Sequence, residues 1–213
     1  MILLKDEPNL AKEMLILAVK NFSISIFSFL ALLLTACAGP ATEYCLQAKD
    51  WQVKNKRGKD EAIRLTYFIQ PEKTKEVFLK IKKDNKADKF GLVKKIANYV
   101  KALPYKEEEK DFWNYVDETI ENGGDCEDKA HLLASLLISV GFRDVYAIKG
   151  ELKKGFLKKR RGHVWVEIIL NEKFYILETL KGYPLMQEKR KTAGYFSFFK
   201  YNNKESFYIK ERD

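Results

Sequence analysis

The chain has 213 residues, enough for one domain with a hydrophobic core and an N-terminal extension. Its hydrophobic content of 46% and charged content of 32% are typical of a lysine-rich globular protein, and the absence of repeats excludes a repeat architecture. The formal charge of +9 favours acidic partners, including anionic membrane surfaces, without identifying one.

An uncharged apolar run occupies residues 21–35, directly after Lys20. A run of about 15 residues is shorter than the roughly 20 that span a bilayer and is typical of a signal peptide core. The run ends in Leu-Thr-Ala-Cys37, which resembles a bacterial lipobox. Residues 1–37 are therefore predicted to be a signal peptide with Cys37 lipidated, or alternatively an uncleaved anchor helix. Both interpretations predict an exported domain held at the extracytoplasmic face of the cell membrane.

Residues 38–60 are polar and lysine-rich and are expected to tether a domain that occupies residues 61–213. Translation could begin at Met1 or at Met14, which would give a shorter leader.

The first half of the domain carries helical patterns. Residues 63–69 fit a strand or a short helix, and residues 71–82 fit a helix with Pro71 at its first position. Residues 90–103 are amphipathic and stop at Pro104.

A further helix is expected over residues 107–121, with acidic residues in its first turn. Its apolar face is most simply core, although Trp113 or Tyr115 could also line a cleft.

The segment Asn-Gly-Gly-Asp-Cys-Glu-Asp-Lys-Ala (122–130) begins a helix that ends before Gly141. Asp125 can accept a hydrogen bond as the N-cap residue, and Asp128 completes an acidic variant of the capping box. Cys126 then lies at the positive end of the helix dipole, which favours thiolate over thiol. The alternative is an ordinary helix start that happens to carry a cysteine.

Strand patterns follow at residues 144–149, 163–170 and 173–180, and residues 194–210 fit a final hairpin. A two-residue turn at 171–172 would place residue 165 opposite residue 178, so that His163 is diagonal to Glu178 on the same face. A slip of one residue would separate them onto opposite faces. His131, the other histidine, lies about 140° around the helix from Cys126 and cannot easily face it.

A cysteine at a helix start, a strand histidine and an acid on the next strand together suit nucleophilic catalysis. The imidazole takes the thiol proton, the acid holds the imidazole, and the helix N–H groups stabilise an oxyanion. Each residue alone has a simpler structural interpretation, and only the combination favours an enzyme.

The chain resembles the transglutaminase-like cysteine peptidase superfamily, which has the papain-like fold, over roughly residues 90–182. The motifs that carry the resemblance are ANYVKALPY (97–105), WNYVDET (113–119), GGDCEDKA (123–130), GHVWV (162–166) and YILET (175–179). It resembles most the prokaryotic transglutaminase-like proteins, and more distantly the periplasmic proteases that release surface adhesins.

The resemblance implies an α+β fold in which N-terminal helices pack on an antiparallel sheet, with Cys126 as nucleophile, His163 as base and position 178 as the third triad member. The family generally has aspartate there, and this chain has Glu178. In the adhesin-cleaving branch, acidic residues beside the cysteine help to bind calcium. Asp125, Glu127 and Asp128 occupy similar places here, although without a cation they would raise the cysteine pKa.

These features predict a thiol peptidase or amidase that acts on a protein or peptide amide through a thioester and requires no cofactor, with calcium as an option. The alternatives are an inactive domain that binds peptide or envelope components, and a transglutaminase or acyltransferase. The basic segment 153–161 is either a solvated hairpin or a site that holds an acidic substrate or anionic head groups. Nucleic acid is not an expected partner of an exported protein.

Overall fold

The computed structural model describes residues 43–47, 54–55, 64–82, 88–107, 112–153 and 160–211. Contacts divide the chain into a compact unit, Cys45–Lys210, and a second unit of Met1–Tyr44 with Glu211–Asp213. The predicted leader, its lipobox cysteine and most of the tether lie outside the described residues. Among the residues that are described, no helix has both the length and the apolar character needed to cross a membrane.

Helices form one layer of the compact unit. They are α2 (Lys75–Lys82), α3 (Lys89–Ala102), α4 (Val116–Asn122) and α5 (Cys126–Ser139), preceded by short 3₁₀ turns at Leu65–Phe68 and Pro71–Thr74. Pro71 begins its turn as expected, since its fixed φ and missing N–H suit a first helical position.

Strands form the second layer. They are β1 (Glu43–Gln47), β4 (Val145–Lys153), β5 (Arg160–Leu170), β6 (Lys173–Leu177), β7 (Met186–Glu188), β8 (Tyr195–Tyr201) and β9 (Ser206–Glu211), in the order β1-β9-β8-β4-β5-β6-β7. The pairings from β9 to β7 are all antiparallel. Two very short strands, β2 (Lys54–Asn55) and β3 (Phe112–Trp113), form a separate parallel pair.

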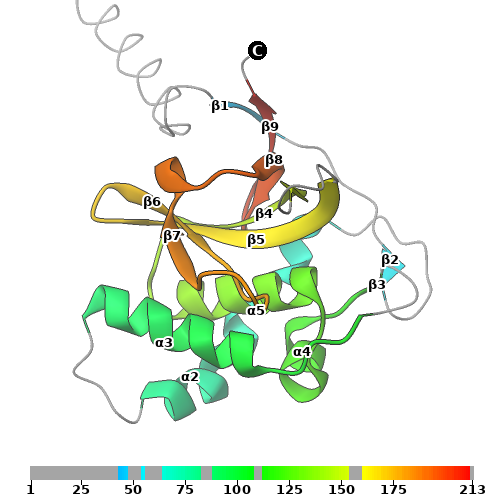
Figure 1. Ribbon diagram of the computed structural model, residues 1–213. Coiled ribbons are helices and arrows are strands. Elements are labelled where there is room, and N and C mark those ends of the chain that lie inside the picture. Colours follow the sequence, from blue (N-terminus) through cyan, green and yellow to red (C-terminus); the bar gives the residue numbers. More distant parts are fainter. Residues whose placement is uncertain are drawn as a thin grey trace, which may run out of the picture. The chain divides into compact units, whose positions relative to one another are not determined.

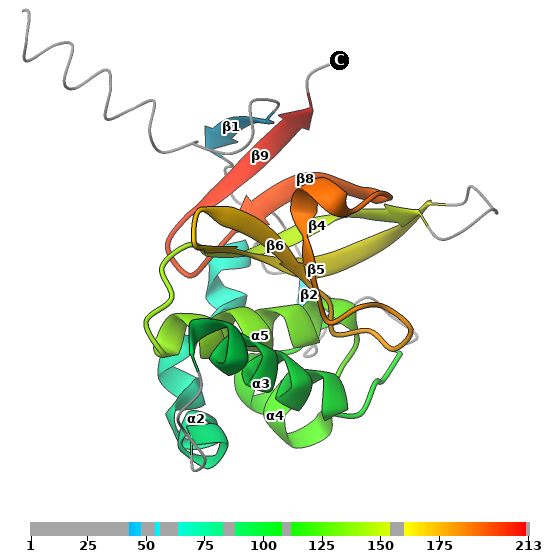
Figure 2. The same ribbon diagram turned by 60° about the vertical axis from the view of Figure 1, so that its left-hand side comes forward.

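The helices cover one face of the sheet, with α5 lying directly against β4 and β5 (Figures 1 and 2). Helix α5 is buried from Glu127 to Leu137 and not along one stripe only, because α3 and α4 pack on the side away from the sheet. The prediction of an α+β fold, with N-terminal helices on an antiparallel sheet, is confirmed. Its core contains Phe68, Val93, Ile96, Val100, Leu133, Leu136, Leu137, Val145, Val166 and Ile168.

The turn between β5 and β6 is the predicted two-residue turn. Asn171 and Glu172 have φ values of 48° and 62°, the left-handed conformation that a tight hairpin of this kind requires. Leu170 pairs with Lys173 and Val166 with Leu177, so continuing the register places position 165 opposite position 178. The predicted register is therefore confirmed, although β6 ends at Leu177 and Glu178 follows it directly.

Two local predictions are wrong. The helix expected over residues 107–121 begins only at Val116, because Phe112 and Trp113 pair with β2 and Tyr115 takes the extended N-cap conformation. Asp125 occupies the N-cap position of α5 without a capping hydrogen bond from its side chain. Gly141 does follow the end of α5 with a φ of 97°, as its place after the last turn requires.

Candidate active site

Cys126 is the first residue of α5, and the loop before it is held against the segment that follows α3. The Gly124 N–H donates to the Pro104 carbonyl oxygen, and the Lys106 N–H donates to the Gly124 carbonyl oxygen, each at 3.2 Å. Gly123 has a φ of 77°, and a Cβ there would lie 2.3 Å from the Pro104 oxygen. Glycine is required at this position to present the cysteine at the helix start.

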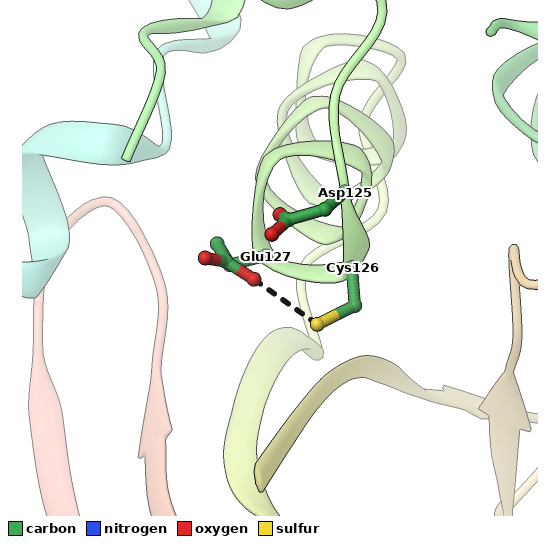
Figure 3. Close-up of side chains that lie close together, drawn as sticks. All are labelled: Asp125, Cys126 and Glu127. Atoms are coloured by element: carbon green, nitrogen blue, oxygen red, sulfur yellow. Dashed lines mark hydrogen bonds between the residues drawn. The ribbon is translucent and has the colours of Figure 1, made fainter. Parts of the chain in front are cut away.

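The Cys126 thiol donates a hydrogen bond to Glu127 Oε2 at 3.0 Å (Figure 3). Burial raises the thiol pKa well above its usual value, and the charges of Glu127 and Asp125 raise it further. A backbone hydrogen bond from Val164 on β5 acts in the opposite direction. The carboxylates and burial thus outweigh the helix dipole that was expected to favour the thiolate.

His163, on β5, is held by Glu178. Its Nε2 lies 2.8 Å from Glu178 Oε2, and the two side chains are only 4% and 1% exposed. Glu178 Oε2 also accepts from the Tyr195 hydroxyl at 3.3 Å, and its Oε1 accepts from the Leu180 N–H at 2.9 Å. Because Nε2 is engaged by the acid, Nδ1 is the ring nitrogen left for a proton exchange with a thiol. The extra methylene of glutamate is accommodated in this register.

Cys126 and His163 line the same cavity, which has a volume of about 880 Å³. The structure thus brings the predicted cysteine and histidine to one cavity, with Glu178 behind the histidine. The other lining residues are Tyr105, Glu107, Lys129, Leu152, Arg161, Gly162, Thr179, Leu180, Lys181 and Tyr183.

The acidic residues around the cysteine divide into two groups. Ligand atoms of Asp125, Cys126 and Glu127 lie within 4.8 Å of one another (Figure 3). Burial, together with a hydrogen bond and charge repulsion from Asp125, raises the pKa of Glu127 to about 9. Two carboxylates this close share a proton or a cation, and their oxygens suit a hard cation such as calcium, whereas the thiol does not.

Asp128 does not belong to that group, contrary to the expected calcium ligand set. Its Oδ1 accepts from the Asn114 N–H at 2.8 Å, and its Oδ2 accepts from Asn114 Nδ2 at 2.6 Å. It is fully buried, and that burial is the main cause that raises its pKa to about 7. Asp128 therefore links the start of α5 to Asn114, the residue before the N-cap of α4.

The aromatic residues considered for the cleft lie elsewhere. Trp113 is buried in the core between Phe68 and His131, and Tyr115 is stacked on Phe68. Neither lines the cavity, where the aromatic residues are Tyr105 and Tyr183. His131 is fully buried in this aromatic cluster and does not line the cavity with Cys126, in agreement with the prediction that it cannot easily face the cysteine.

Two residues near Cys126, His163 and Glu178 were not singled out from the sequence. Lys129 lines the cavity three residues after Cys126, and that spacing on one helix is the signal that could have found it. Tyr195 reaches Glu178 from β8, and no local pattern indicates this, because the contact depends on the order of strands across the sheet.

Comparisons with known proteins bear on the family and the fold. Residues 78–179 match the model of the transglutaminase-like superfamily. Calcium-bound Legionella pneumophila LapG superposes with a TM-score of 0.51 at 16% identity, over 66% of this chain and 88% of that one. Its EGTA-treated form gives 0.52 at 16% identity, over 68% and 89%. A further LapG structure from that organism gives 0.52 at 17% identity, over 66% and 86%. No curated protein matches the chain. Residues 78–179 are therefore similar to the transglutaminase-like superfamily, and the LapG structures share the fold of this chain.

Proposed function

We propose that the protein is a thiol peptidase or amidase that cleaves a protein or envelope amide through a thioester. The observation that carries the proposal is that Cys126 lines the same cavity as His163, whose Nε2 is hydrogen-bonded to Glu178 at 2.8 Å. A nucleophile, a base and an acid that orients the base are the parts that acyl transfer needs.

In the proposed reaction, His163 Nδ1 accepts the thiol proton as the Cys126 sulfur attacks the amide carbonyl carbon. Backbone N–H groups at the start of α5 stabilise the oxyanion that forms. His163 then gives its proton to the leaving amine, and a thioester remains. Water, deprotonated by His163, attacks the thioester and releases the acid and the free thiol. Glu178 keeps the ring oriented and stabilises it while it is charged.

Positive charge beside the thiol would assist the first step, because Glu127 and Asp125 raise the thiol pKa. Calcium held by the Asp125 and Glu127 carboxylates would supply it. The calcium-bound form of the structurally similar LapG supports this part of the proposal.

The test measures alkylation of Cys126 by iodoacetamide at pH 7 in the full chain with Cys37→Ser and Cys45→Ser, so that one thiol remains. Cys126 is expected to be alkylated faster in calcium than in EGTA. The Glu127→Gln variant should lose most of this difference in rate. Peptide cleavage should be lost in Cys126→Ala and in His163→Ala. A native thiol that reacts no faster than the denatured one, with or without calcium, would contradict the proposed catalysis.

A second candidate function is a catalytically silent domain that binds peptide or envelope components in the same cavity. The hydrogen bond from the thiol to Glu127 and the raised thiol pKa favour it. Peptide binding that is unchanged in Cys126→Ala, without cleavage by the wild type, would identify this function. A covalent adduct with an added amine would instead identify a transglutaminase or acyltransferase.

We also propose that the protein is exported and tethered to the membrane through residues 1–37. The uncharged run at 21–35 and the cysteine that ends the lipobox-like sequence support this location. Cys37→Ser should move the protein from the membrane fraction to the soluble one after export. Unchanged fractionation of the variant, without incorporated lipid in the wild type, would favour an uncleaved anchor.

A further inference from the structure

A buried lysine lies beside the cysteine, and no acidic residue that the structure describes forms an ion pair with it. Lys129 is 2% exposed and lies three residues after Cys126, so both side chains project from neighbouring positions on one side of α5. Its Nζ donates to the Leu103 carbonyl oxygen at 2.7 Å and lies 5.9 Å from the centre of the Tyr105 ring. An ammonium has three N–H donors, and this carbonyl uses one of them.

Two more cations line the cavity that holds Lys129. Arg161 lies on β5 two residues before His163, and Lys181 follows Glu178 by three residues; both are exposed. We call Lys129, Arg161 and Lys181 the cationic side of the cavity. Among the described residues, no ion pair involves any of the three.

The charge on this side of the cavity is poorly compensated. Among the described residues that line the cavity, the only carboxylate is that of the exposed Glu107. Bringing cations together in a partly enclosed site costs free energy unless an anion joins them.

A structural role explains only part of this arrangement. Lys129 binds a carbonyl at the C-terminal end of α3, where a cation is favourable. That contact does not account for Arg161 and Lys181, which come from the sheet side and line the same cavity.

We propose that the cationic side binds a carboxylate of the substrate, so that the protein selects peptides with an acidic residue close to the amide at Cys126. This inference rests on the proposed function in taking a peptide as the occupant of the cavity. Arginine and lysine bind carboxylates through charge-assisted hydrogen bonds, which are stronger where water is excluded. A peptide suits the site better than a membrane surface does, because the three cations line one cavity together with Cys126 and His163.

The experiment measures binding in the full chain carrying Cys126→Ala, so that it does not depend on turnover. Fluorescein-labelled hexapeptides of glutamate, glutamine and lysine are titrated at low and at high salt, and fluorescence anisotropy is followed. We expect the glutamate peptide to bind at least tenfold more tightly than the glutamine peptide, with the difference shrinking in salt. Lys181→Glu and Arg161→Glu should each weaken that binding by about tenfold, the effect of losing one charged hydrogen bond.

Lys204→Glu is the matched control, since it reverses an exposed charge that does not line the cavity. Lys129→Met tests the buried position with a side chain of similar length, and its circular dichroism spectrum shows whether it folds. Equal binding of the glutamate and glutamine peptides, or equal weakening by Lys204→Glu, would overturn the proposal. Displacement of the peptide by vesicles of phosphatidylglycerol, at matched charge, would overturn the choice of a peptide.

The cleavage assay separates this inference from the proposed function. If the glutamate peptide binds as expected but the wild type cleaves no peptide, the proposed catalysis fails and the acidic specificity stands. If peptides from a random library are cleaved without enrichment of acidic residues near the cut, the specificity fails and the catalysis stands.

Discussion

Replacing Glu127 by glutamine should stabilise the protein at neutral pH. Glu127 is 5% exposed and lies between the Cys126 thiol and the Asp125 carboxylate. Folding moves this carboxyl out of water and next to a second negative charge, and raises its pKa from 4.5 to about 9. Glutamine has the same shape, can accept from the thiol and can donate to Asp125, so the variant keeps the hydrogen bonds and avoids the cost of protonating a carboxylate on folding.

The sign and size of the effect follow from that pKa. Below pH 4.5 the carboxyl is protonated in both the folded and the unfolded chain, and it does not penalise folding. Above that pH the unfolded chain is ionised and the folded chain is not, so stability falls as the pH rises, until the pH reaches about 9. At pH 7 the free energy of unfolding is lower by about 3 kcal/mol, since each pH unit above 4.5 lowers it by about 1.4 kcal/mol.

Urea denaturation of wild type and Glu127→Gln at pH 4.5 and pH 7 measures this difference. We expect nearly equal free energies of unfolding at pH 4.5 and a variant that is more stable by about 3 kcal/mol at pH 7. The matched control is Glu121→Gln, which changes an exposed glutamate at the end of α4 and should alter neither value. A variant that is destabilised at pH 7, or stabilised equally at both pH values, would refute the reasoning.

Three further perturbations have defined outcomes. Tyr195→Phe removes the hydroxyl that donates to Glu178 at 3.3 Å and should lower kcat about fivefold with little change in KM. A change in KM alone would contradict the role of Tyr195 in positioning Glu178. Burial lowers the pKa of His131 from 6.5 to about 3, so the stability that its neutral form contributes is complete above pH 6.5 and is lost as the pH falls towards 3. His131→Asn should therefore flatten the acid side of the stability profile measured by urea denaturation, and an unchanged slope would argue against a neutral buried imidazole. Gly124→Ala places a Cβ 2.3 Å from Asp128 Oδ2 and should lower the free energy of unfolding by about 2 kcal/mol, measured by thermal or chemical denaturation. Gly141→Ala is the control, because a Cβ there meets no neighbour, and any loss that it shows comes from the positive φ alone.

The amino-acid sequence determined the features that depend on short spacings along the chain. The turn at Asn171 and Glu172 and the alternation of β5 and β6 place His163 on the same face as Glu178, because a two-residue hairpin admits one register. The glycines before Cys126 and Gly141 after the last turn mark where α5 starts and ends. These are local rules, and neighbouring residues suffice to apply them.

Only the tertiary structure decided the electrostatic character of the site. The thiol pKa depends on burial, on how Glu127 and Asp125 are turned, and on a backbone N–H of β5, a strand that is distant in the sequence. Asp128 leaves the acidic group because Asn114 from another segment binds it. Lys129 is buried beside the cavity because α3 ends against α5. Burial and charge interactions sum over groups from several segments, so spacing along the chain does not determine them.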